Sequence, residues 1–147
     1  MNLPEITPHD ARARLESGDG NVYLDVRTVA EFEKGHPPGA WNVPVMSRHA
    51  DGRMAPNDHF LRVVEATLPK GAMVISGCRS GRRSARAASI MLQAGYTNVV
   101  NMVGGFSGAH DPSGQLLQPG WSTLNFPTTT GNGGEKSYDA LRREPAL

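Results

Sequence analysis

The single cysteine of the chain, Cys78, stands in a segment that combines a nucleophile with glycine and several cations. This segment reads Cys78-Arg79-Ser80-Gly81-Arg82-Arg83-Ser84. An apolar run precedes it and an alanine-rich run follows it, so we expect the cysteine where a strand ends and a helix begins. A helix start offers free N–H groups and partial positive charge, and the arginines add to that field, which favours a thiolate. The alternative is that Cys78 is a small buried hydrophobic residue.

The length of the arginine-bearing loop separates two reactions of a nucleophilic cysteine. Tyrosine and dual-specificity phosphatases place five residues between the cysteine and the arginine that binds the phosphate, usually with a histidine before the cysteine. Here Ser84 stands at that arginine position, Gly77 precedes Cys78, and the last arginine of the loop, Arg83, comes one residue earlier. A shorter ring of donors suits one sulfur atom carried on the cysteine better than a phosphoryl group. The spacing therefore favours a persulfide.

Four segments follow one another in an order typical of one family. They are Leu24-Asp25-Val26-Arg27 with Glu31-Phe32, then Gly35-His36-Pro37-Pro38-Gly39-Ala40-Trp41-Asn42-Val43-Pro44, then the Cys78 loop, then Asn101-Met102-Val103-Gly104-Gly105-Phe106. With these motifs the chain resembles a single-domain rhodanese-family sulfurtransferase over roughly residues 5 to 125. The resemblance implies that Cys78 is the catalytic residue, which accepts the sulfur. The substrate-binding residues that it implies are Arg79, Ser80, Gly81, Arg82, Arg83 and Arg27.

The resemblance also implies supporting residues around the loop. Arg27 would steady the loop or the incoming anion, and Asp25 and Ser84 would support the site. The alternative for Asp25 and Arg27 is a structural ion pair or a cap at a strand end. Glu31 is interpreted as structural, because the segment from Thr28 to Glu31 has the form of a capping box. His36 lies in a turn that serves the fold in this family, and a thiolate that its loop already ionises needs no general base.

Composition limits the classes of function. The chain has 147 residues, of which 38% are hydrophobic, as one domain requires, and its net charge of +1 argues against nucleic acid or membrane as a partner. A single cysteine excludes an internal disulfide and favours a reducing compartment. The histidines show no ligand spacing with one another or with Cys78, so we expect no metal and no cofactor. No signal peptide or membrane-spanning run is visible, so we expect a cytoplasmic protein.

The order of the expected elements predicts the fold class. Strands are expected over 22–26, 41–45, 73–76 and 99–103, and helices over 8–18, 29–34, 59–67 and 84–94. This alternation predicts an α/β fold with a small parallel β-sheet flanked by helices on both faces, the three-layer rhodanese-like architecture. We expect a rhodanese-like domain over 1–126 and a flexible polar C-terminal tail over 127–147. The segment 46–56 is interpreted as a solvated loop without an assigned role.

These observations together predict a thiosulfate sulfurtransferase that works through a persulfide on Cys78. Thiosulfate is the expected sulfur donor, and cyanide, a small thiol or a thioredoxin-like protein is the expected acceptor. We expect a monomer or a weak homodimer. Two alternatives stay open: a non-catalytic sulfur-relay or protein-binding rhodanese module, and a cysteine-dependent phosphatase or arsenate reductase, which Ser84 disfavours.

Overall fold

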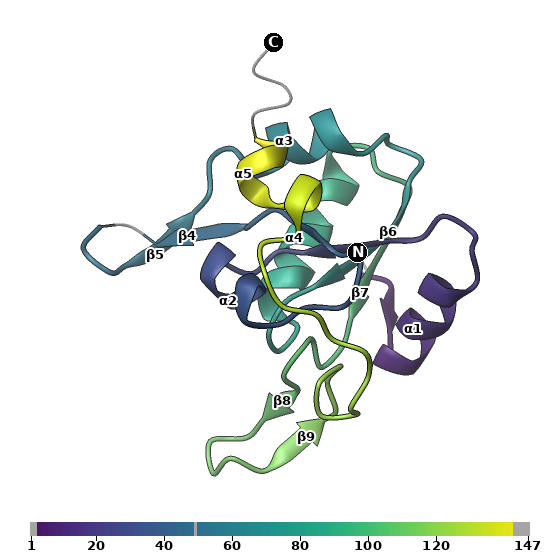
Figure 1. The fold of residues 1–147 in the computed structure, drawn as a ribbon, viewed down its shortest axis with the longest axis vertical. Coiled ribbons are helices and arrows are strands. Elements are labelled where there is room, and N and C mark those ends of the chain that lie inside the picture. The colour runs from purple at the N-terminus through teal and green to yellow at the C-terminus, as the bar shows by residue number, and fades with distance from the viewer. Residues whose placement is uncertain (1–2, 49, 143–147) are drawn as a thin grey trace.

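A five-stranded parallel sheet forms the centre of the computed structural model, which describes residues 3–48 and 50–142 (Figure 1). The strand order is β1-β7-β6-β2-β3, and every neighbouring pair is parallel. These strands are β1 (Glu5–Ile6), β2 (Val22–Asp25), β3 (Trp41–Asn42), β6 (Met73–Gly77) and β7 (Asn98–Met102). The predicted parallel sheet is thereby confirmed. The edge strand β1 is too short to show a periodic pattern in the sequence.

Helices cover both faces of this sheet, as predicted. They are α1 (Pro8–Glu16), α2 (Val29–Lys34), α3 (Phe60–Thr67) and α4 (Arg82–Gln93). One buried cluster contains Val63 of α3 and Met91 of α4, and a second contains Ala11 of α1 and Phe32 of α2. The three-layer α/β architecture follows from these two apolar cores. No helix of the described residues is long and apolar enough to cross a membrane.

Local capping explains where α2 begins. The Thr28 Oγ1 accepts a hydrogen bond from the Glu31 N–H at 3.3 Å, and the Glu31 carboxylate accepts one from the Thr28 N–H at 3.2 Å. This confirms the predicted capping box. Because α2 follows directly after β2, the box also fixes the Glu31 side chain at the carboxyl end of the sheet.

Two hairpins extend from the domain, and the first lies in the segment 46–56 that the sequence predicts as a solvated loop. The first consists of β4 (Met46–Arg48) and β5 (Met54–Pro56), and the second of β8 (Ala109–His110) and β9 (Leu116–Gln118). Figure 1 shows them projecting to the left and downwards. In the first hairpin Met46 and Met54 are half-buried and Arg48 donates to the Gly52 carbonyl at 2.8 Å. These contacts hold together a segment whose strands are too short to show alternation.

The C-terminal segment differs from the flexible tail expected over 127–147. Within it lie a short 3₁₀ helix (Gly134–Lys136) and α5 (Tyr138–Leu141). Thr129 pairs with His36 through two backbone hydrogen bonds of 2.9 Å, and the Leu141 side chain is buried in the cluster that contains α3 and α4. The described part of the segment is therefore packed along the domain. The end of the predicted tail, 143–147, lies outside the described residues, and the boundary at 126 stays a prediction.

Candidate active site

Cys78 lies directly after β6, where a short loop leads into α4. Its Sγ accepts a hydrogen bond from the Gly81 N–H at 3.1 Å. Gly81 has φ +110°, a conformation that favours glycine, and it occupies the position before the first residue of α4. Among the described residues, the N–H groups of Arg79 and Ser80 have no hydrogen-bond partner. The loop therefore holds the sulfur on one donor and leaves others free to bind an anion.

The Cys78 side chain is buried. It is only 1% exposed and belongs to the apolar cluster on the α4 side of the sheet. The sequence predicts a nucleophile that a substrate can reach, so this burial is a difference between expectation and structure. In the conformation seen, Cys78 therefore offers almost no surface to a sulfur donor.

The turn after β7 hydrogen-bonds with the backbone of the Cys78 loop. The Phe106 N–H donates to the Cys78 carbonyl at 2.7 Å, and the Ser107 N–H donates to the Arg79 carbonyl at 2.8 Å. Gly105 has φ +57°, and a Cβ there would lie 2.6 Å from both carbonyl oxygens. Only glycine allows the two backbones to approach so closely.

Ser84 is fully buried and fixes the start of α4 to the sheet. Its hydroxyl donates to Asn101 Oδ1 at 2.5 Å, and the Asn101 amide donates in turn to the Gly81 carbonyl at 3.3 Å. The Ser76 hydroxyl donates to the Ser84 carbonyl at 3.0 Å. The position where a phosphatase carries its phosphate-binding arginine therefore faces the protein interior.

Tyr23 occupies the space beside Gly77, the residue before the cysteine. A Cβ at position 77 would collide with the Tyr23 hydroxyl and ring. That hydroxyl is buried and has no hydrogen-bond partner among the described residues. Burial, with the charge of Asp25 added, raises the pKa of Tyr23 well above its ordinary value, so the phenol stays protonated. Glycine at position 77 is thus a packing requirement.

Asp25 and Arg27 form a buried ion pair. The Asp25 carboxylate accepts from Arg27 Nε at 3.0 Å and from Nη2 at 2.7 Å. Arg27 also donates to the Gly35 carbonyl at 2.6 Å, and its guanidinium lies 4.5 Å from the centre of the Phe106 ring. Burial tends to lower the pKa of Arg27, but its hydrogen bonds to Asp25 raise it overall. These contacts tie Arg27 to Asp25, to the end of α2 and to the turn that holds the Cys78 loop, and its predicted contact with substrate stays a prediction.

Arg83 is already engaged by an internal carboxylate. Its guanidinium donates two hydrogen bonds to Glu31, at 2.7 and 2.9 Å. Burial tends to raise the pKa of Glu31, but the bonds and charge of Arg83, with the bonds from Thr28, outweigh it and lower that pKa from 4.5 to about 2. The last arginine of the loop is therefore bound to α2 through Glu31.

Two cavities flank the loop, and Arg79 and Glu31 line both. One, of about 460 Å³, we call the arginine cavity; its lining residues are Glu31, Met46, Arg48, Met54, Arg79, Arg82, Arg83 and Arg86. The other, of about 290 Å³, is lined by Arg27, Glu31, Lys34, Gly35, Arg79, Phe106 and Ser107. Cys78 lines neither cavity. Of the predicted substrate-binding arginines, all four border one or both.

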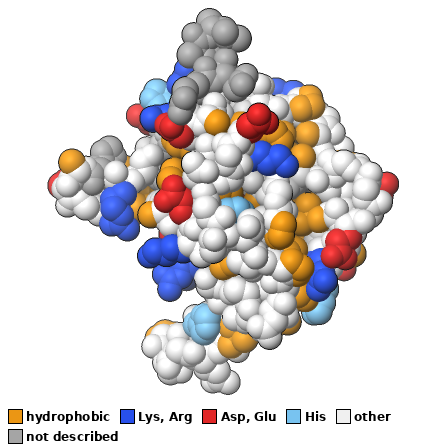
Figure 2. Space-filling view, viewed as in Figure 1, with side chains coloured by type: hydrophobic (Ala, Val, Ile, Leu, Met, Phe, Trp, Pro, Cys, Tyr) orange, Lys and Arg blue, Asp and Glu red, His pale blue; other side chains and the backbone are white. Residues whose placement is uncertain are grey.

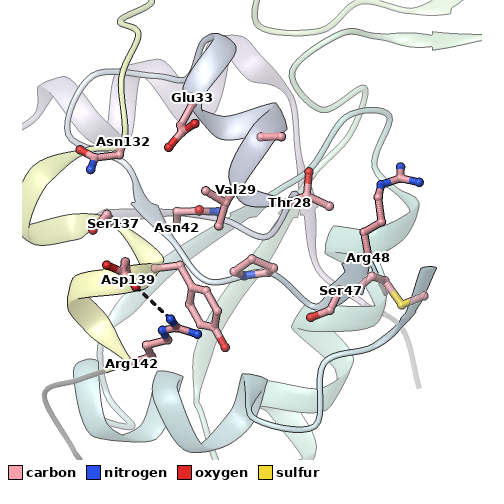
Figure 3. A pocket seen from close by; sticks show the side chains of 14 residues that line it. Thr28, Val29, Glu33, Asn42, Ser47, Arg48, Asn132, Ser137, Asp139 and Arg142 are labelled. Carbon is pink, nitrogen blue, oxygen red and sulfur yellow. Dashed lines mark hydrogen bonds and ion pairs between the residues drawn. The ribbon is translucent and has the colours of Figure 1, made fainter. Parts of the chain in front are cut away.

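A larger cavity, of about 570 Å³, lies away from the cysteine between α2, β4 and α5 (Figure 3). Asn42 and Ser137 lie in its wall, and Asp139 and Arg142 pair at its edge. Arg48 lies at the opposite side, with its guanidinium directed away from Asn42 (Figure 3). No residue of the Cys78 loop lines this larger cavity, so size alone does not identify the active site.

His36 has a structural place, as expected. Its ring stacks on Phe32 with centroids 3.6 Å apart, and Nδ1 hydrogen-bonds with the Phe32 carbonyl at 2.7 Å. Within residues 3–48 and 50–142, no group of three histidine, cysteine, aspartate or glutamate side chains is placed to hold a metal ion.

Comparison with known proteins decides the family. The family model described as Rhodanese-like domain matches residues 7–111 of this chain. The chain belongs to this rhodanese-like family. It is 48% identical over 88 residues to Thiosulfate sulfurtransferase 16, chloroplastic, of Arabidopsis thaliana, covering 60% of this chain and 72% of that one. It is 30% identical to Thiosulfate sulfurtransferase GlpE of Haemophilus influenzae, covering 74% and 89%.

A solved structure and further relatives set the extent of the likeness. A crystal structure from M. tuberculosis superposes on this rhodanese-like chain with a TM-score of 0.73 at 32% identity, covering 89% of this chain and all of that one. In three other plant relatives the matched part spans only 51% to 57% of their length. Two relatives are named chloroplastic and one is named mitochondrial, and the expected cytoplasmic location of this chain stays a prediction.

Sequence reasoning misses three residues that shape this rhodanese-like site. The motifs give no individual role to Asn101, Tyr23 or Gly105. Asn101 hydrogen-bonds with Ser84 and Gly81, and Tyr23 fills the space that a side chain at position 77 would need. Gly105 lets the turn after β7 approach the carbonyl groups of the Cys78 loop. A polar residue at the end of a predicted buried strand is the one available signal, and it applies to Asn101. The other two act through contacts between segments far apart in the chain.

Proposed function

We propose that the chain transfers the sulfane sulfur of thiosulfate to a thiophilic acceptor through a persulfide on Cys78. A sulfurtransferase activity is supported by its rhodanese-like family and by relatives named for that activity. The observation that carries the finer proposal is the Cys78 loop itself. It places Sγ at a helix start on the Gly81 N–H, beside free N–H groups and arginines.

In the first half of the reaction the Cys78 thiolate attacks the outer sulfur of thiosulfate. The new Sγ–S bond forms as the S–S bond of thiosulfate breaks, and sulfite leaves with the electron pair. Arg79 and Arg82, which belong to the loop and line the arginine cavity, would meet the charge of thiosulfate and then of sulfite. The free loop N–H groups are suited to bind the outer sulfur of the persulfide.

In the second half an acceptor removes that sulfur. Cyanide attacks the outer sulfur and leaves as thiocyanate, which returns Cys78 to its thiolate form. A thiol acceptor would leave as its own persulfide in the same way. Donor and acceptor thus react in turn at one atom, so ping-pong kinetics are expected.

Intact-mass measurement tests the persulfide directly. After incubation with thiosulfate the protein is expected to gain the mass of one sulfur atom, and cyanide is expected to remove it. Cys78→Ser should abolish both the mass gain and the turnover. Appreciable thiosulfate:cyanide turnover by that variant would refute the proposal, and a faster gain from 3-mercaptopyruvate than from thiosulfate would change the donor.

One alternative of a different class is a sulfur-relay module that passes its persulfide only to a protein partner. Such a module would gain the sulfur atom yet show negligible turnover with small acceptors. A phosphatase is disfavoured because Ser84 is tied to Asn101 inside the protein. Hydrolysis of p-nitrophenyl phosphate would reinstate it.

A further inference from the structure

The arginine cavity concentrates positive charge that the rest of the chain lacks. Five of the fifteen Lys and Arg residues line it, against one carboxylate, although the net charge of the whole chain is only +1. Figure 2 shows Lys and Arg side chains gathered on and below the β4–β5 hairpin. The cavity therefore attracts anions locally, beside the loop that carries the nucleophile.

Most of these arginines have no structural partner. Glu31 engages Arg83, but the side chains of Arg79, Arg82 and Arg86 make no hydrogen bond or ion pair with the described residues. Arg48 gives a single hydrogen bond to the Gly52 carbonyl, which leaves most of its donors free. Their cations are exposed on the surface and available to a ligand.

The position of Arg82, Arg83 and Arg86 on α4 costs stability. Arg82 and Arg83 open the helix, whose first turn contains no acidic residue, and cations are unfavourable at a helix N-terminus. Arg82 and Arg86 stand four residues apart on one face and repel each other. A structural role does not account for this arrangement, whereas binding of an anion does.

The arginine cavity is larger than thiosulfate needs. At about 460 Å³ it is in the range of small-molecule sites and far exceeds the needs of thiosulfate, which has five atoms. Two of its arginines, Arg48 on the hairpin and Arg86 on the second turn of α4, lie outside the Cys78 loop. The half-buried Met46 and Met54 give it an apolar wall.

We propose that Arg48 and Arg86 form a carboxylate-binding subsite that selects small anionic thiols as sulfur acceptors. This inference rests on the proposed function. The acceptor thiolate attacks the outer sulfur of the protonated Cys78 persulfide, the Sγ–S bond breaks with its electron pair on Sγ, and the acceptor leaves as a persulfide. The carboxylates of the acceptor bind the two arginines while its thiol points to the loop.

The test compares two thiols as acceptors for the thiosulfate-loaded enzyme. Mercaptosuccinate carries two carboxylates and 2-mercaptoethanol carries none, so the ratio of their kcat/KM values measures selectivity for the anion. Arg48→Ala and Arg86→Ala should each lower this ratio by about three- to tenfold, and high salt should reduce the effect. Arg86→Gln leaves the hydrogen bond from Arg48 to the Gly52 carbonyl intact, and it should lower the ratio as well. Arg53→Ala is the matched control, because Arg53 lies on the same hairpin, pairs with Asp51 and does not line the cavity.

The outcomes separate this inference from the proposed function. If the wild-type protein turns over thiosulfate and cyanide but the ratio is the same in all variants, only the subsite is refuted. An equal fall in Arg53→Ala would also refute it, because the effect would then reflect the general field of the hairpin. If the Arg48 and Arg86 variants lose turnover only when a thioredoxin is the acceptor, the cavity binds a protein acceptor and the proposal is overturned. A wild-type protein without cyanide turnover would refute the proposed function and this inference together.

Discussion

Replacing Glu31 by glutamine should destabilise the protein at neutral pH and much less in acid. The substitution keeps the shape of the side chain but removes the charge that binds Arg83. A Glu31 pKa of about 2 instead of 4.5 corresponds to about 3 kcal/mol of folding free energy at neutral pH. The side chains of Arg83 and Glu31 are 24% and 30% exposed, so solvent screening reduces this value, and we expect a loss of about 1 to 2 kcal/mol.

The pH dependence has a definite sign. Because folding lowers the pKa of Glu31, its contribution is complete above the unfolded value of 4.5 and is lost as the pH falls towards 2. The difference between wild type and Glu31→Gln should therefore be constant from pH 7 to about pH 5.5 and shrink below that.

Urea denaturation followed by tryptophan fluorescence, at several pH values from 7 to 3.5, measures this difference. Glu33→Gln is the matched control: Glu33 lies on the same helix and its side chain has no partner among the described residues, so its loss should stay within about 0.5 kcal/mol. An equal loss in both variants at pH 7, or a Glu31→Gln loss that does not shrink in acid, would refute the reasoning.

Two further predictions concern packing, and urea denaturation measures both. Leu141→Ala should cost about 2 to 4 kcal/mol because Leu141 is 3% exposed, while Leu117→Ala at 65% exposure should cost less than about 0.5 kcal/mol; equal losses would mean that the C-terminal segment detaches in solution. Gly77→Ala should cost about 1 to 3 kcal/mol through its collision with Tyr23, whereas Gly71→Ala, with nothing near its Cβ position, should be nearly neutral. Matching losses at the two glycines would contradict the packing described here.

The sequence predicts the sheet and its helices because their apolar patterns are local. The strands ending at Asp25 and Gly77 and the helix beginning after Gly81 occur within a few residues of their expected bounds. The hairpin over 46–56 escapes prediction because three-residue strands show no alternation. The packing of 127–142 is not predicted because this polar, glycine-rich segment is held by backbone hydrogen bonds to residues far away in the chain. Leu141 also packs in a buried cluster of distant residues.

The sequence predicts where Cys78 lies in the fold but not which side chains surround it. The loop sequence predicts Cys78 at a strand–helix junction, and the structure places it there. Charge and spacing alone do not reveal that Arg83 forms an ion pair with Glu31 or that Arg27 forms one with Asp25. They also do not reveal that Cys78 is only 1% exposed. Each of these depends on which side chains the fold brings together, and single-sequence patterns carry no such distances.

The interlock of Gly77 with Tyr23 restricts the evolutionary routes open to this fold. A lineage that acquired a histidine before its nucleophile, as phosphatases usually have, would first have to replace Tyr23 by a smaller residue, since the two side chains cannot coexist in one volume. The order of the two substitutions is thereby fixed, because the reverse order passes through an overcrowded intermediate. Related sequences with a histidine at position 77 should accordingly carry a residue smaller than tyrosine at position 23.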